Sequence, residues 1–264
     1  MICADTISVV RGKRRTLFEL TVTLSPGEVL AVIGANGAGK STLLKALCGD
    51  LIPHQGVVDI DGRPLSSIPI GELARLRGVL PQYSSLAFPF SVIDVVLMGR
   101  HPHNNGNDGE EDRRYAREAL RMVDMLHLSD RIYTTLSGGE AQRVQLARVL
   151  AQIWDAPPGD DRYLFLDEPT SSLDLAHQHG ILAIARLLAA KGYGIFVVLH
   201  DLNLAAQYAD RVLLLKDGRR LALGTPREVL SEERIAEGFG LAVDLLPHPS
   251  RDCPLVVTRP VSGG

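Results

Sequence analysis

The chain alternates short, continuous apolar runs with longer stretches in which apolar residues recur at helical spacing. The runs at residues 29–33, 163–167 and 195–200 are apolar almost throughout, which is typical of central strands buried on both faces. Strands that alternate with helices along a chain usually pair in parallel. The pattern therefore predicts an α/β fold with a mostly parallel sheet and helices on both faces.

The pattern changes between about residues 84 and 155, where strand-like runs disappear. Residues 91–100 and 110–126 have helical periodicity, and the polar segments 101–112 and 155–161 are expected to be loops. His101 and His103 have no cysteine or carboxylate at ligand spacing, so we expect a solvated loop there. The expected organisation is one domain (1–245), with a core of residues 1–83 and 156–245, an inserted helical subdomain of about residues 84–155 and a C-terminal tail of residues 246–264.

Composition narrows the possible function classes. The chain has 28 Lys and Arg residues against 31 Asp and Glu residues, a net charge of −3, so no nucleic-acid partner is expected. Its three cysteines are scattered and lack a CxxC spacing, which indicates neither a disulfide framework nor a zinc site. No apolar run reaches the ~18 residues that span a bilayer, and we expect a cytoplasmic protein.

The sequence GANGAGKST at residues 34–42 predicts a phosphate-binding loop. It follows an apolar run and precedes a helical stretch, the context in which G-x-x-x-x-G-K-[ST] binds phosphate. Three glycines let backbone N–H groups turn toward a phosphate, Lys40 supplies charge to the outer phosphates, and Ser41 is placed for Mg²⁺. A glycine-rich turn without a ligand is the alternative, which the flanking elements disfavour. The expected nucleotide-binding residues here are Gly34, Asn36, Gly37, Ala38, Gly39, Lys40, Ser41 and Thr42.

Polar residues follow the two other apolar runs. Asp167 and Glu168 come at the carboxyl end of a predicted strand, where ligands of parallel sheets bind. We expect Asp167 to hold Mg²⁺ and Glu168 to orient and polarise the attacking water; a solvated loop carboxylate is the alternative. His200 ends the third run, and by itself a structural histidine explains it equally well. The neighbouring motifs favour a catalytic role.

The order of these motifs resembles that of the ATP-binding-cassette (ABC) ATPases. Along the chain come the phosphate-binding loop, Gln82 in VLPQYSS, LSGGE at 136–140, YLFLDEP at 163–169, SSLD at 171–174 and His200. The resemblance covers about residues 8–240. It implies a P-loop NTPase core with an inserted helical subdomain that carries the LSGGE signature motif, and an ATPase that uses ATP and Mg²⁺.

In that family the signature motif of one subunit covers the γ-phosphate bound by another, in a head-to-tail dimer. The resemblance implies that this chain pairs with a second copy of itself and that the motif and the adjacent D-loop contribute Ser137, Gly138, Gly139, Glu140, Ser172 and Asp174. Paired glycines permit close backbone approach, and the following helix directs its positive end at the nucleotide. Ser137 and Glu140 also have the spacing of a plain capping box, which is the alternative.

Gln82 is expected to connect the phosphate site with the surface that faces a membrane partner. Its amide oxygen can bind Mg²⁺ or the attacking water when the site closes and release it at little cost afterwards, because it carries no charge. We therefore expect a catalytic and metal-binding role, with a plain loop glutamine as the alternative.

The chain departs from the family pattern at the adenine contact. Cassette ATPases usually place an aromatic residue before an N-terminal glycine, whereas Val10 and Arg11 precede Gly12 here. The planar guanidinium of Arg11 is expected to stack on the base instead.

Residues 88–103, 197–218 and 224–230 resemble the ATPases of iron-chelate, haem and cobalamin importers, and those of haem importers most closely. The resemblance implies a peripheral subunit on the cytoplasmic face of the inner membrane, bound to integral-membrane permease subunits and serving a periplasmic substrate-binding protein through them. A ferric siderophore or cobalamin importer is the first alternative. The second, a soluble cassette ATPase acting on nucleic acid or ribosomes, would usually show paired cassettes, long arms or a basic face.

Overall fold

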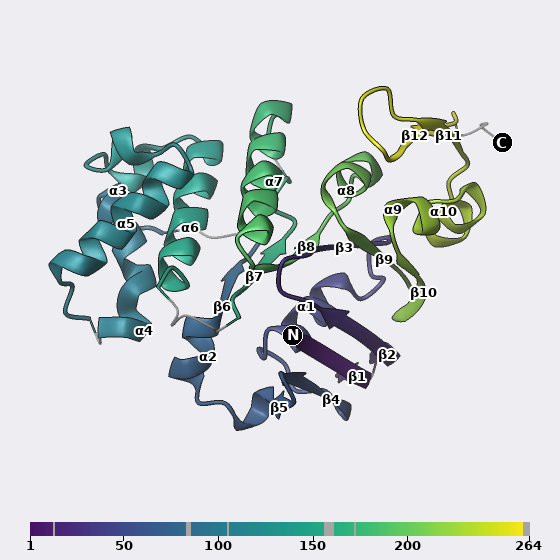
Figure 1. The fold of residues 1–264 in the computed structure, drawn as a ribbon, viewed down its shortest axis with the longest axis horizontal. Coiled ribbons are helices and arrows are strands. Elements are labelled where there is room, and N and C mark those ends of the chain that lie inside the picture. Colours follow the sequence, from purple (N-terminus) through teal and green to yellow (C-terminus); the bar gives the residue numbers. More distant parts are fainter. Residues whose placement is uncertain (13, 83–85, 105, 156–160, 172, 261–264) are drawn as a thin grey trace.

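A parallel sheet forms the centre of the computed structural model, which describes residues 1–12, 14–82, 86–104, 106–155, 161–171 and 173–260. Within these residues the sheet has the order β10 (Arg219–Gly224), β9 (Arg211–Lys216), β3 (Val29–Ile33), β8 (Gly194–Val198), β7 (Tyr163–Asp167) and β6 (Arg77–Leu80) (Figure 1). All neighbours are parallel except β10 and β9. The predicted mostly parallel sheet is confirmed.

Side chains of β3 enter two separate cores, which explains why the strand is apolar throughout. Leu30 and Val32 pack with α1 (Lys40–Leu47). Val29, Ala31 and Ile33 belong to the other core, which includes α7 (Leu175–Ala190) and α8 (Leu202–Tyr208). Because both faces of the strand are buried, polar residues are excluded from it.

An antiparallel sheet covers the same face of the parallel sheet as α1 does, and the sequence pattern did not predict it. Its order is β2 (Arg14–Leu24), β1 (Ile2–Arg11), β4 (Gln55–Ile60) and β5 (Arg63–Pro64), and α2 (Ile70–Leu76) follows it. The pairing of β1 with β2 shifts register between Ala4 and Ile7 and again between Ile7 and Val10. These bulges interrupt the two-residue alternation by which a half-buried strand is recognised. This face of the parallel sheet is therefore covered by a second sheet as well as by a helix.

Helices make up most of the segment between β6 and β7. They are α3 (Val92–Leu97), η2 (Met98–Arg100), α4 (His101–Asn104), α5 (Glu110–Met122), η3 (Leu126–Leu128), η4 (Tyr133–Thr135) and α6 (Gly138–Gln152), grouped at one end of the molecule in Figure 1. Buried residues of α3, α5 and α6 pack together and continue the core that β3 shares with α7. The last of these helices, α6, begins at the LSGGE motif.

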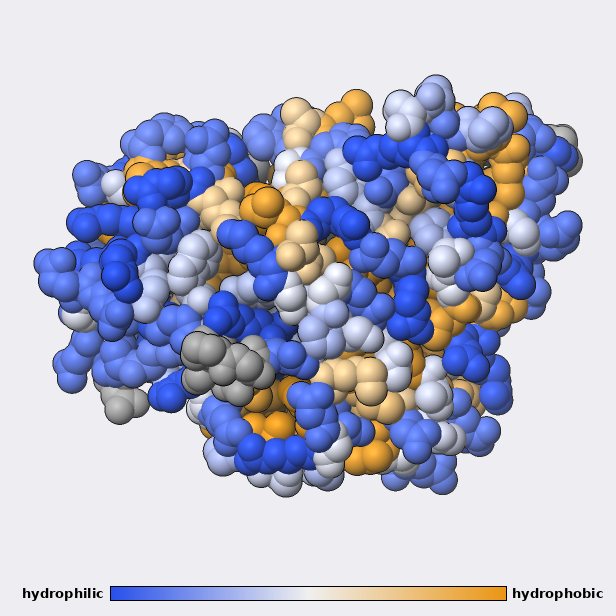
Figure 2. All heavy atoms as spheres, in the orientation of Figure 1, coloured by the Kyte–Doolittle hydropathy of each residue, from blue (hydrophilic) through white to orange (hydrophobic). Residues whose placement is uncertain are grey.

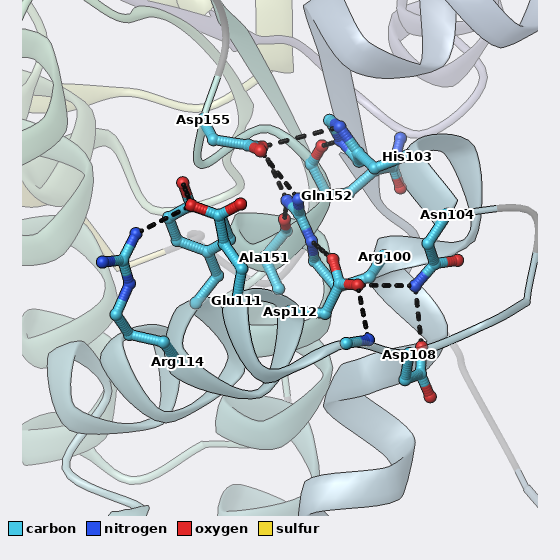
Figure 3. A network of polar contacts seen from close by, with 12 residues as sticks. Arg100, His103, Asn104, Asp108, Glu111, Asp112, Arg114, Ala151, Gln152 and Asp155 are labelled. Carbon is cyan, nitrogen blue, oxygen red and sulfur yellow. Dashed lines mark hydrogen bonds and ion pairs between the residues drawn. The ribbon is translucent and has the colours of Figure 1, made fainter.

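A buried arginine joins three parts of this helical segment (Figure 3). Arg100 is 2% exposed. Its guanidinium donates to Asp112 Oδ1 at 2.8 Å, to the two oxygens of Asp155 at 2.6 and 2.7 Å, and to the Ala151 carbonyl at 2.7 Å. The contacts connect η2 with the start of α5 and the end of α6, so Arg100 fixes how the signature helix sits in the segment.

The expected solvated loop at His101 and His103 is wrong. Both residues lie in α4, and His103 is half-buried, with Nε2 2.7 Å from the Gln152 carbonyl and Nδ1 3.6 Å from Asp155 Oδ1. Polar composition predicted a loop, but the contacts with the end of α6 hold one turn of helix here.

The last strands that the structure describes form a small hairpin. After α9 (Pro226–Val229) and α10 (Glu232–Phe239), β11 (Val243–Pro247) pairs with β12 (Pro254–Thr258). Asn203 of α8 holds the hairpin, since its side chain donates to the Val256 carbonyl at 3.0 Å and accepts from the Val256 amide at 2.7 Å. The expected boundary at residue 245 falls inside β11.

Most of the face shown in Figure 2 is hydrophilic. In the part of the chain that the structure describes, every helix is too short or too polar to cross a membrane.

Candidate functional site

The phosphate-binding loop joins β3 to α1 in the predicted place. Gly34 and Gly39 have φ values of 149° and 105°, and a Cβ on Gly34 would lie 2.3 Å from the Leu215 carbonyl oxygen. These positions therefore require glycine for both conformation and space. Lys40 is buried, and its Nζ donates to the carbonyls of Gly34 at 2.8 Å and Ala35 at 3.1 Å. The lysine is thus held across the mouth of the loop.

Burial lowers the pKa of Lys40, while the carboxylates of Glu168 and Asp167 act in the opposite direction. Burial likewise raises the pKa of Asp167, opposed by a hydrogen bond from Ser41 and reinforced by the charge of Glu168. Both groups are therefore less stable in their charged forms than in water. A ligand that brings negative phosphates to the lysine and a cation to the carboxylate would relieve both penalties.

Ser41 and Asp167 meet at the loop, with Ser41 Oγ 3.3 Å from Asp167 Oδ1. A hydroxyl and a carboxylate provide the oxygen ligands that Mg²⁺ prefers. Burial disfavours the charged form of this carboxyl, and a bound cation would offset that penalty. The residues present therefore fit a magnesium ion bound together with phosphate oxygens.

Three side chains converge at the carboxyl ends of neighbouring strands. Gln82 follows β6, Glu168 follows β7 and His200 follows β8. Gln82 Nε2 donates to Glu168 Oε2 at 2.6 Å, and His200 Nε2 lies 2.6 Å from Glu168 Oε1. Glu168 adopts a φ of 51°, a left-handed conformation that costs energy for a residue with a side chain. The sequence predicts a catalytic role for all three residues, and the order of their strands in the sheet explains why they meet.

A cavity of about 680 Å³ opens beside this cluster and the phosphate loop. Of the sequence-predicted residues, it is lined by Arg11, Asn36, Gly37, Gly39, Lys40, Ser41, Thr42 and Glu168. Arg11 is exposed at the end of β1. The structure thus places the expected base-stacking residue at the same cavity as the phosphate loop.

The other wall of the cavity, which no sequence motif indicated, contains Arg15, Phe18 and the turn Asp217–Gly218. The guanidinium carbons of Arg15 and Arg219 lie 4.8 and 4.7 Å from the centre of the Phe18 ring. The Phe18 amide donates to the Gly218 carbonyl at 2.9 Å, which joins β2 to the turn between β9 and β10. The Asp-Gly pair between two apolar runs was the available signal for that turn.

The signature residues do not line this cavity in the isolated chain. Ser137 and Glu140 form a capping box, in which Ser137 Oγ accepts from the Glu140 amide at 3.3 Å and Glu140 Oε2 accepts from the Ser137 amide at 2.7 Å. A Cβ on Gly138 would meet nothing within 4 Å, and one on Gly139 would make only ordinary contact with Leu173 and His177. The fold of the single chain therefore does not require either glycine.

Asp174 caps α7, where its carboxylate accepts from the His177 amide at 2.9 Å and lies 2.7 Å from His177 Nδ1. The hydrogen bond from the His177 amide lowers the pKa of Asp174. Ser172, the other expected D-loop residue, lies outside the described residues. Asp174 has a capping role within the chain, and its expected role between chains is a separate proposal.

Comparison with known proteins shows which family has these motifs. The sequence profile of the family described as "ABC transporter" matches residues 17–171, which is more than half of the chain. The chain belongs to the ABC transporter family. It is an ATP-binding ATPase subunit, as the order of its motifs implied.

The curated relatives of this ABC subunit match over almost its whole length. The hemin import ATP-binding protein HmuV of Gloeobacter violaceus is 56% identical over 257 residues, covering 97% of this chain and 94% of the relative. The protein of the same name from Myxococcus xanthus is 52% identical over 251 residues, covering 95% and 94%. Similarity at this level extends well beyond the shared ATPase motifs.

Solved ABC structures have the same fold. An inward-facing transporter described as of the metal-chelate type matches with a TM-score of 0.83 and 30% identity, covering 98% of this chain and 96% of that chain. A dimeric cassette in a post-hydrolysis state, bound to ADP and Pi, matches with a TM-score of 0.72 and 27% identity, covering 85% and 98%. The predicted P-loop NTPase fold is confirmed.

Proposed function

We propose that this chain is the ATPase subunit that powers haem import by an ABC importer. The observation that carries the proposal is the 56% identity with the hemin import protein of Gloeobacter violaceus, which extends over nearly all of both chains. The site supports the ATPase part of the proposal, and the similarity outside the site supports the cargo.

ATP is proposed to bind with its phosphates in the loop at residues 34–42 and its base toward Arg11. Lys40 already lies across the loop, and Arg11 lines the same cavity. Arg15 and Phe18 form the neighbouring wall, so the base lies against guanidinium groups and not against a free aromatic face. Asn36, Ala38 and Thr42 complete the loop around the phosphates.

Ser41, Asp167 and Gln82 would hold Mg²⁺ in this site. When bound there, the ion would neutralise charge that develops on the phosphate oxygens during hydrolysis. The chain itself orients the reacting groups. Ser41 Oγ and Asp167 Oδ1 are already within 3.3 Å of each other, so little rearrangement is needed.

Glu168 is proposed to be the base that orients and polarises the attacking water. Its two carboxylate oxygens are occupied by Gln82 and His200. A water can take the place of one donor while the other keeps the carboxylate aimed, and His200 remains within reach of the phosphate that is released. In this arrangement the hydrogen bond from Gln82 helps to set the direction in which Glu168 faces the water.

The complete ATPase is proposed to be a head-to-tail dimer of two copies. The N-terminus of α6 carries a positive partial charge at a point where Gly138 has open space around it. Ser137, Gly138, Gly139 and Glu140 would then cover the nucleotide of the partner copy, and the D-loop residues Ser172 and Asp174 would line the same interface. A solved dimeric ABC cassette with a TM-score of 0.72 to this chain and 28% identity is compatible with such a pairing.

The membrane partner is proposed to dock beside α3. Phe88 and Phe90, 68% and 38% exposed, have ring centres 6.2 Å apart in the segment that connects Gln82 with α3. Their position connects an apolar contact surface with the catalytic cluster. The proposal places the subunit on the cytoplasmic face of the inner membrane, bound to permease subunits that receive haem from a periplasmic binding protein.

Reconstitution tests the proposal. The chain, co-expressed with its cognate permease, is placed in liposomes with hemin, a ferric siderophore or cobalamin on the binding-protein side, and uptake is measured with ATP and without it. ATP-dependent uptake of hemin above the other two cargoes is expected. Uptake of a siderophore or cobalamin in preference to hemin would contradict the cargo and leave the ATPase role standing.

A further inference from the structure

The loop that follows Glu168 is held from two helices. Gln142 on α6 donates from Nε2 to the Pro169 carbonyl at 2.6 Å. Gln178 on α7 donates to the carbonyls of Thr170 at 3.2 Å and Leu173 at 3.0 Å. The two helices stand side by side in Figure 1, and the start of α6 approaches Leu173 and His177. Two helices thus position one loop, but only α6 begins with the signature motif.

The backbone at Glu168 depends on this loop. Its φ of 51° is strained, and its carbonyl accepts from both the amide and the hydroxyl of Ser171, at 3.1 and 2.9 Å. Pro169 is buried, and a buried carbonyl without a hydrogen-bond donor costs free energy, so the hydrogen bond from Gln142 stabilises the backbone at this point. A shift of Gln142 would therefore pull directly on the residue that follows the catalytic carboxylate.

The helix start has room to move relative to the catalytic cluster. A cavity of about 230 Å³ lies between the end of β6, the loop after β7 and α6, and it is lined by Gln82, Gly138 and Gln142 among others. Gln142 lies four residues after Gly138, about one helical turn. Any displacement of the signature glycine on contact with a nucleotide is thus transmitted to Gln142 through a single turn of helix.

We propose that Gln142 is a positioning residue that transmits the state of one ATP site to the other. The inference rests on the proposed head-to-tail dimer, in which the signature motif of a chain contacts its partner's ATP while Glu168 serves the chain's own ATP. The hydrogen bond from Gln142 to Pro169 connects these two tasks within one chain. Glu168 is correctly placed when the partner's ATP holds the signature helix, and each site then favours hydrolysis when the other is filled.

Mixed dimers with one live site test this link. Two differently tagged copies are purified together, and one of them, the inactive copy, carries Glu168→Gln. Its ATP site is then either intact or emptied by Lys40→Ala, and the turnover of the live copy is measured at saturating ATP in both cases. The readout is the ratio of the two kcat values, which a general loss of activity would not change.

In the unaltered live copy, emptying the partner site is expected to lower kcat on the order of tenfold, because misplacement of a catalytic group by a fraction of an ångström to 1 Å costs this much or more. Gln142→Met in the live copy removes the N–H donor at similar length, and the ratio is expected to fall to about 1 with KM for ATP little changed. The same substitution in the inactive copy should leave the ratio as it was. Gln142→Lys, which retains a donor, should restore it.

Gln178→Met is the matched control, because it removes a donor to the same loop from a helix without the signature motif. It is expected to keep the ratio. An unchanged ratio in Gln142→Met, or an equal loss in Gln178→Met, would overturn the link. If Gln142→Met does not fold, as judged by thermal unfolding, Gln142→Glu serves in its place. Turnover of the live copy that is unaffected by Gly138→Asp in the inactive copy would instead overturn the shared-site dimer, and this inference with it.

Discussion

Gln82 Nε2 lies 2.6 Å from Glu168 Oε2, so the amide that precedes the helical segment is bonded to the carboxylate that follows β7. The other oxygen of the same carboxylate faces His200 at 2.6 Å. A carboxylate bonded in this way is well oriented, and each of its oxygens keeps a lone pair that can accept a hydrogen bond from the attacking water. The Gln82 contact therefore couples catalysis to whatever moves the segment that contains Phe88 and Phe90.

Gln82→Ala tests this coupling. The substitution removes the hydrogen bond that orients Glu168 Oε2 but leaves the phosphate loop unchanged. ATP affinity should therefore stay near normal while turnover falls on the order of tenfold. The additional turnover stimulated by the cognate permease should fall as well. ATPase rates measured with and without that permease in lipid give both quantities. Stimulation of normal size in the variant would contradict a coupling role.

Glu168→Gln should bind MgATP and hydrolyse it very slowly. The amide keeps the shape of the side chain but cannot accept a proton from water, and the loss of a general base typically costs on the order of 10²- to 10⁴-fold in rate. Nucleotide binding by fluorescence and phosphate release in one preparation separate the two effects. His200→Ala, which removes a neighbour of Glu168 and keeps the carboxylate, is the comparison and should lose less. Turnover near normal in Glu168→Gln would remove this residue from its role.

Lys40→Ala and Gly138→Asp should fail in different ways. Lys40 is built into the chain's own phosphate loop, so its loss should weaken ATP binding by the monomer about 10- to 100-fold, the range of a charged hydrogen bond. Gly138 lies in open space, so an aspartate there should leave monomer binding intact and abolish turnover by opposing a partner's phosphate. Equilibrium binding at concentrations below dimerisation distinguishes them. Equal weakening by both variants would contradict the shared site.

The parts of the site predicted from sequence are those that local rules determine. The phosphate loop was identifiable because its glycines, lysine and flanking strand are contiguous, and Gly34 and Gly39 do have the positive φ values that this motif needs. Glu168 and His200 were identifiable because each comes at the end of an apolar run, and Gln82 because of its place in the motif order of the ABC ATPases. The three side chains meet because β6, β7 and β8 are neighbours in the sheet.

The missed parts depend on contacts between distant segments. Phe18 and Arg15 reach the cavity only because β2 pairs with the bulged strand β1 and bonds to the turn at Gly218. Gln142 resembles any polar residue of a surface helix until Pro169 is brought to its side chain. Arg100 lies at the end of a stretch for which only helical periodicity was predicted, and its partners Asp112 and Asp155 come from elements that only the packing of the helical segment brings together.

The Arg100 cluster yields a prediction about stability. Arg100→Met removes the cation that pairs with the largely buried carboxylates of Asp112 and Asp155. Breaking a buried ion pair in this way typically costs about 3 to 5 kcal/mol. The free energy of unfolding at pH 7, measured by urea denaturation, should fall by about 3 kcal/mol. The control is Arg114→Met on α5, whose pair with Glu111 is 63% and 71% exposed. It should change stability by less than about 0.5 kcal/mol.

The loss of unfolding free energy caused by Arg100→Met is expected to become smaller as the pH is lowered. Burial alone would raise the pKa of Asp112 and of Asp155, but hydrogen bonds and charge from Arg100 outweigh it and hold both pKa values below the usual range. In the unaltered chain their stabilising effect is therefore complete above the ordinary aspartate pKa of about 3.9 and is lost only as the pH falls through the lower folded values. Without Arg100, the hydrogen bonds of Asp112 to Asn104 and the Gly109 amide remain, and His103 still lies near Asp155, but the largest contribution that opposes burial is lost. Both pKa values should therefore rise, and the two carboxyls should take up protons earlier during acidification. The stability gap between Arg100→Met and the unaltered chain should accordingly narrow as the pH is lowered from 7 toward 4. A gap that widens over this range, in the same urea titrations, would show that Arg100 does not stabilise the charged forms of these two acids.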